Sequence, residues 1–88
     1  MSVAETLADG LAKATLDAME FIDDDRFYEK VSRVIGGSSP TLQEAFMTSI
    51  RVRLAERRGQ EFVAKALAAA KSGAAAPDAP KDMSVDGH

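Results

Sequence analysis

A change of apolar face within one helical stretch, Thr41 to Lys71, constrains the fold of this chain more than any other feature. In its first part the large apolar residues recur at every fourth position and form one stripe: Leu42, Phe46, Ile50 and Leu54, joined by Met47. After Gly59 a second helical set follows: Phe62, Val63, Ala66, Leu67 and Ala70. At about 100° per residue, the second set lies roughly opposite the first. A straight helix would therefore need partners on both sides; otherwise the chain must break near Gly59.

The chain is long enough for one small domain. Of its 88 residues, Ser72 to His88 hold few bulky apolar side chains, which predicts a flexible tail. Residues 1–71 then form a helical domain, whose single core supplies little stability on its own. There are no cysteines and the one histidine is His88, so disulfides and clusters of thiolate or imidazole metal ligands are excluded. Self-association is the remaining source of stability, and we expect a homodimer.

Charge is distributed unevenly along the chain. Eight acidic residues oppose three basic ones from Met1 to Lys30, whereas seven bases oppose three acids from Val31 to Ser72, and the formal net charge is −3. The two halves can neutralise each other by folding back or by pairing between subunits. No segment reaches the ~18 consecutive apolar residues of a membrane span, and no secretory signal is visible. We therefore expect a cytoplasmic protein without membrane contact. The abundant alanine and the several arginines indicate a GC-rich bacterial genome, which concerns codon usage alone.

The spacing of apolar residues predicts an all-α fold. Ser2 and Glu5 have the spacing of a capping box at the start of a first helix. The apolar side of that helix is broad and consists of Val3, Leu7, Leu11, Ala14, Ala18, Phe21 and Ile22, widened by Ala4, Ala8, Ala12 and Met19. A second helix spans about Asp24 to Ile35, with an aspartate as its N-cap. Its apolar face consists of Phe27, Val31, Val34 and Ile35, with Tyr28 at the edge.

Glycine and proline mark the connections between these helices. Gly36-Gly37 should close the second helix with a positive φ. Ser39-Pro40 then begin a third helix, with serine as N-cap and proline at the first helical position, and this helix runs to about Arg58. Gly59 either ends the third helix or is absorbed into it, and Gln60 to Lys71 form the last helical segment. Because no alternating β pattern is present, the sequence predicts a small bundle of three to four helices.

An arginine-rich segment, Arg51 to Arg58, is the only basic concentration in this acidic chain. Arginine and aromatic side chains are the usual anchors of protein interfaces. We therefore predict a non-enzymatic accessory or regulatory protein that binds a protein partner through a helical surface. The predicted partner-binding residues are Arg51, Arg53, Arg57, Arg58 and Phe62.

Two other interpretations of the arginines stay open. In the first, the aliphatic parts of the Arg53 and Arg57 side chains cover the core, and their guanidinium groups pair with the acidic first helix. In the second, the protein is a small nucleic-acid-binding regulator whose arginines contact phosphates, so that binding weakens steeply with salt. The net negative charge opposes this second interpretation, as does the lack of aromatic residues between the arginines.

The sequence offers no catalytic, cofactor or metal site. Residues 1–71 contain no cysteine or histidine, and the single tyrosine, Tyr28, has no identifiable acid–base partner. The acidic residues between Glu20 and Glu29 lack the glycine and terminal glutamate of a calcium loop. Leu54 to Gly59 superficially resemble the start of a helix-turn-helix, but Gln60 stands where that motif needs an apolar residue. We expect no enzyme activity, no cofactor and no small-molecule substrate.

Overall fold

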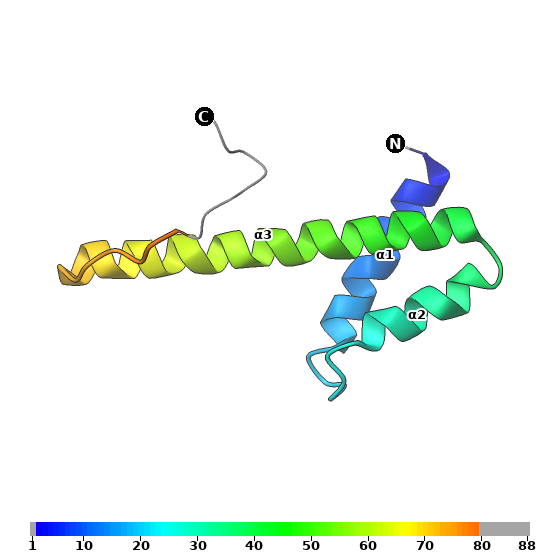
Figure 1. The fold of residues 1–88 in the computed structure, drawn as a ribbon, viewed down its shortest axis with the longest axis horizontal. Coiled ribbons are helices and arrows are strands. Elements are labelled where there is room, and N and C mark those ends of the chain that lie inside the picture. The colour runs from blue at the N-terminus through cyan, green and yellow to red at the C-terminus, as the bar shows by residue number, and fades with distance from the viewer. Residues whose placement is uncertain (1, 80–88) are drawn as a thin grey trace. The chain divides into compact units, whose positions relative to one another are not determined.

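The computed structural model describes residues 2–79, and three α-helices make up most of that part of the chain (Figure 1). They are α1 (Val3–Ala18), α2 (Phe27–Gly36) and α3 (Pro40–Ser72). The described residues contain no β-strand, which confirms the all-α prediction. There are three helices rather than four because α3 continues through Gly59. The chain divides into two parts, Met1–Ala55 and Glu56–His88, which are described separately below.

The predicted capping box begins α1. The Ser2 hydroxyl accepts a hydrogen bond from the backbone N–H of Glu5 at 3.1 Å, and the Glu5 carboxylate accepts one from the N–H of Ser2 at 3.0 Å. These two bonds satisfy backbone donors that have no partner within the helix. The bond from the Ser2 N–H, followed by the contact with its hydroxyl, lowers the pKa of the Glu5 carboxyl.

The start of α2 differs from the prediction. The helix begins at Phe27, later than expected, and its N-cap residue, Arg26, forms no side-chain cap. Asp24 holds the preceding turn instead, since its carboxylate accepts a hydrogen bond from the N–H of Arg26 at 3.1 Å and forms an ion pair with Nζ of Lys30 at 2.7 Å. The lysine contact is the main reason why the pKa of Asp24 is lowered. The aspartate therefore stabilises the turn before the helix rather than the first helical turn.

The glycines after α2 also act differently from the prediction. Gly73 is the one glycine with a positive φ among the described residues, so the expected positive φ at Gly36-Gly37 was wrong. Gly36 leaves room for a side chain: a Cβ there would overlap the end of the Gln43 side chain, which would have to move. That side chain donates from Nε2 to the carbonyl oxygen of Ser32 at 2.9 Å, which joins α2 to the start of α3.

The beginning of α3 follows the sequence closely. Pro40 is its first residue, and the Ser39 hydroxyl accepts from the N–H of Leu42 at 3.1 Å, as an N-cap serine does. The predicted stripe on this half is confirmed at its centre, because Phe46 and Ile50 are fully buried. The first half of α3 therefore supplies the two largest side chains of the core.

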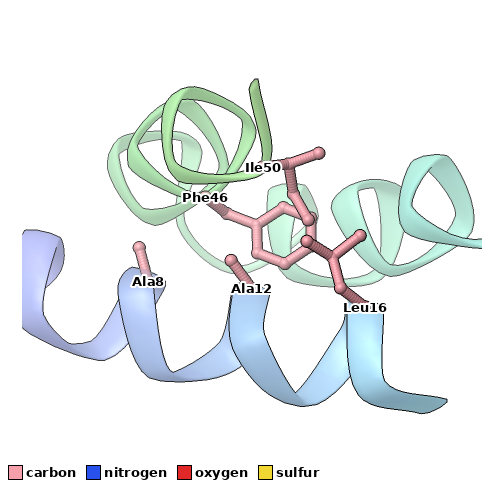
Figure 2. Packing of buried hydrophobic residues seen from close by; sticks show 5 residues of the cluster. All are labelled: Ala8, Ala12, Leu16, Phe46 and Ile50. Atoms are coloured by element: carbon pink, nitrogen blue, oxygen red, sulfur yellow. The ribbon is translucent and has the colours of Figure 1, made fainter. Parts of the chain in front are cut away.

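The core lies between α3 and a narrow edge of α1. Figure 2 shows the Phe46 ring among three residues of α1 and Ile50 of α3. The three α1 residues are Ala8, Ala12 and Leu16. Because Ala8 and Ala12 are small, the ring can approach the backbone of α1 closely. The core thus uses the alanine edge of α1 rather than the centre of its apolar side.

Other apolar residues predicted to share the core face are exposed. On α1, Val3 and Leu7 keep 77% and 60% of their accessible surface, and on α2 Val34 keeps 75%. On α2 the predicted face residues Val31 and Ile35 do pack against the core, together with the edge residue Tyr28. Periodicity therefore identified the apolar faces of both short helices but did not show which of their residues are exposed.

The helical part ends at Ser72, one residue beyond the predicted domain boundary. Gly73 has a φ of 77°, and the N–H of Ala74 donates to the carbonyl oxygen of Ala69 at 2.9 Å. A left-handed glycine of this kind commonly closes a helix. Of the predicted flexible tail, residues 73–79 have no regular secondary structure, and residues 80–88 lie outside the described part.

Candidate protein-binding surface

The C-terminal part of α3 carries an apolar surface that the structure does not bury. We call it the distal face; it consists of Gly59, Phe62, Val63, Ala66, Leu67 and Ala70. Its three large side chains keep 36% (Phe62), 61% (Val63) and 52% (Leu67) of their accessible surface. None of residues 56–72 is buried. An apolar face of this kind normally packs against something, but this part of the described chain leaves all of its residues at least partly exposed.

Basic residues border one edge of the distal face. Arg58 and Lys65 are seven residues apart, so they project from the same side of the helix, next to Phe62. Neither forms an ion pair with any residue between 2 and 79. At the other edge the carboxylate of Glu56 accepts from Nε2 of Gln60 at 2.7 Å. Glu56 therefore has a hydrogen-bond partner on its own helix, whereas Arg58 and Lys65 form no ion pair within residues 2–79.

The chain itself reaches this basic edge after it leaves α3. We call Gly73–Ala79 the return segment; Figure 1 shows it running back along α3 from the helix end. Pro77 and Asp78 of this segment line one open hollow together with Arg58, Phe62 and Lys65. Two acidic residues, Glu61 and Asp78, thus line the same hollow as two bases and an aromatic ring.

Arg53 has a different role from the other predicted residues. Its Nε and Nη2 atoms lie 3.0 and 2.9 Å from Oδ1 of Asp9 on α1, and the Ser49 hydroxyl donates to the same oxygen at 2.7 Å. The hydroxyl and then the guanidinium lower the pKa of Asp9. The internal interpretation is therefore confirmed for Arg53. Arg57 is exposed and makes no such pair within the described residues.

The five predicted residues do not form one cluster. Arg51 is exposed in the part Met1–Ala55, to which the paired Arg53 also belongs. Arg57 lies on α3 about 100° around the helix from Arg58 and does not line the hollow. The structure brings together Arg58 and Phe62.

A groove between α1 and α3 was not expected from the sequence. It has a volume of about 420 Å³, and its lining combines acidic, hydroxyl and apolar side chains. The lining residues are Glu5, Asp9, Thr41, Glu44, Ala45, Thr48, Ser49 and Val52. Asp9 and Ser49 are 40 residues apart in sequence, so no local spacing could predict their contact. On α3, Thr41 and Ala45 are four residues apart, and so are Thr48 and Val52. This spacing indicates that each pair shares one side of the helix, so the α3 side of the groove could have been found from the sequence.

The described residues show neither a metal site nor a membrane span. No group of three or more His, Cys, Asp or Glu side chains within residues 2–79 is placed to hold a metal ion. None of the three helices there combines the length and the apolar character that a membrane crossing needs. Comparison with models of known protein families, with curated proteins and with solved structures found no match for this chain.

Proposed function

We propose that this protein is a non-enzymatic accessory or regulatory protein of the cytoplasm that binds another protein through the distal face. The observation that carries the proposal is that residues 56–72 form a helix without one buried residue, although three large apolar side chains lie on it. Helices in water owe most of their stability to the packing of an apolar face. A partner protein that covers the distal face would supply this packing.

Two residues are the proposed anchors of the contact. Phe62 offers an aromatic ring and Arg58 offers a guanidinium without an ion pair in the described chain, and both line the same hollow. Buried aromatic and arginine side chains contribute most of the binding energy in many protein interfaces. Arg53 is not among the proposed anchors, because Asp9 and the α1–α3 contact already hold it.

Photo-crosslinking in cells of the source organism tests this proposal. A benzoylphenylalanine at Leu67 lies on the distal face, whereas the same group at Ala68 lies about 100° away around the helix. We expect a crosslinked product with one other protein from Leu67 and none from Ala68. Val63→Glu combined with the probe at Leu67 should abolish the product. Equal products at both positions, or none at either, would contradict the proposal.

A second candidate is a nucleic-acid-binding regulator. Arg51, Arg57 and Arg58 are exposed and form no ion pair in the described part of the chain, which favours phosphate contacts. Fluorescence anisotropy with duplex DNA and single-stranded RNA, at low and near-physiological salt, decides between the two candidates. Binding that weakens steeply with salt and is lost in the double variant Arg57→Glu, Arg58→Glu would support nucleic acid. No binding at low salt would remove this candidate.

A further inference from the structure

The burial within residues 56–79 is confined to one side of α3 and to the return segment. All residues of this range are exposed except three that are half-buried: Ala66, Ala69 and Pro77. Ala66 and Ala69 lie four and seven residues after Phe62, so these three residues share one side of the helix. Pro77 lines the hollow together with Phe62. The half-buried positions therefore lie where the return segment runs along α3 (Figure 1).

The large side chains of the distal face divide between this side and the next one. Phe62 lines the hollow and is less exposed than Val63 and Leu67. Val63 and Leu67 lie about 100° and about 140° around the helix from Phe62, and they do not line the hollow. The return segment thus occupies the Phe62 side of the distal face and leaves the side with Val63 and Leu67 open.

Gly73 directs the chain back along the helix. Its φ of 77° is left-handed, and the N–H of Ala74 donates to the carbonyl oxygen of Ala69 at 2.9 Å, which closes α3. The five extended steps from Gly73 to Asp78 span about 17 Å, the length of about eleven helical residues. This distance brings Asp78 back to the level of Phe62, in agreement with the hollow that both residues line.

The return segment is held in place by few bonds. In the described chain, residues 75–79 form no hydrogen bond, and Asp78 forms no ion pair with Arg58 or Lys65. A binding partner can therefore displace the segment readily. We propose that the return segment is an autoinhibitory strap, which covers the Phe62 side of the distal face and is displaced when the partner protein binds. This inference rests on the function proposed above.

One substitution should release the strap without removing any residue. Gly73→Ala places a helix-forming residue before Ala74-Ala75-Ala76, so α3 should continue into these alanines and stop before Pro77. Pro77 would then leave the hollow. Gly10→Ala is the matched control, because both glycines have open space for a methyl group, but Gly10 lies within a helix and has no positive φ.

A nitroxide attached to Ala79→Cys tests the position of the strap, since the chain has no other cysteine. We expect it to broaden the amide NMR signals of residues 58–65, which include the lining of the hollow. Gly73→Ala should lose this broadening and gain helix by circular dichroism, whereas Gly10→Ala should keep the broadening. Broadening that is limited to the end of α3 in the wild type would overturn the proposal.

Crosslinking from the probe at Leu67, in extract of the source organism, tests the inhibition. If the strap is closed about nine-tenths of the time, its release raises the apparent affinity for the partner about tenfold. Gly73→Ala should therefore reach half-maximal crosslinking at a several-fold lower protein concentration than the wild type, and Gly10→Ala at the same concentration as the wild type.

The outcomes separate the strap from the proposed function. Equal half-maximal concentrations for the wild type and Gly73→Ala, with the broadening lost in that variant, would overturn the inhibition but leave the partner-binding surface intact. No crosslinked product from any of the three proteins would contradict the proposed function, and the inhibition with it, whatever the NMR signals show.

Discussion

The two halves of α3 have the same backbone conformation but different surroundings. In residues 40–55 the apolar face is buried around Phe46 and Ile50, and the N-terminus is capped by Ser39. In residues 56–72 an apolar face of similar width is exposed. The comparison teaches that periodicity shows which residues share a side of a helix, whereas only the rest of the fold decides whether that side is covered.

The two halves should differ most in how much free energy of unfolding is lost when a phenylalanine is replaced by alanine. Phe46→Ala removes a fully buried ring and should cost about 3–5 kcal/mol of the free energy of unfolding, enough to unfold a domain of this size. Phe62→Ala removes a ring that is partly exposed and should change that free energy by less than about 0.5 kcal/mol. Denaturation with urea measures both values. Similar losses in the two variants would mean that the distal face is packed within the free protein.

Alanine substitutions at two glycines should change the free energy of unfolding by smaller amounts, and the two changes should have opposite signs. Gly36→Ala forces the Gln43 side chain to move and to lose its bond to Ser32, at a cost of about 0.5–1.5 kcal/mol. Gly59→Ala adds a methyl group in open space within a helix and should stabilise the protein by up to about 1 kcal/mol. Thermal unfolding followed by circular dichroism shows whether each variant is less or more stable than the wild type. A destabilised Gly59→Ala would reveal a close neighbour at the second half of α3.

The smallest effect on stability is expected from the contacts of Asp9 with Ser49 and Arg53, because the Asp9 side chain is 46% exposed. Ser49 and Arg53 lower its pKa in the folded state, so its contribution to stability is present above the pKa of the unfolded chain and is lost as the pH falls through the folded value. Melting temperature should therefore fall below about pH 4. Asp9→Asn should be less stable at neutral pH and show a shallower decline in acid, whereas Glu61→Gln on the second half should follow the wild type.

Local features of the fold could be predicted from the sequence. The Ser2–Glu5 capping box, the Ser39-Pro40 helix start and the burial of Phe46 and Ile50 all follow from spacings of four residues or fewer. Such features depend on the hydrogen-bonding and steric properties of neighbouring residues, which sequence alone specifies.

The misplaced features depend on contacts that are distant in sequence. The apolar side of α1 is so broad that it could pack in either of two directions. The Phe46 ring packs closely against the small residues of the alanine edge, and Val3 and Leu7 are left exposed. Gly36 appeared to be a turn residue, because the nearby Gln43 side chain was not foreseeable. At the candidate site, Arg58 and Phe62 are four residues apart, so the sequence already places them on one side of a helix. The ion pair between Arg53 and Asp9 joins two helices and could not be predicted from local spacing.

The position of Tyr28 has an optical consequence. It is the only tyrosine, and the chain has no tryptophan, so it dominates the intrinsic fluorescence. Because Tyr28 packs against the core of the first part, its emission reports on that part, while the far-ultraviolet dichroism of α3 reports on both of its halves. One sample heated in both instruments thus shows whether the exposed half of α3 frays before the core melts, without any label attached to the protein.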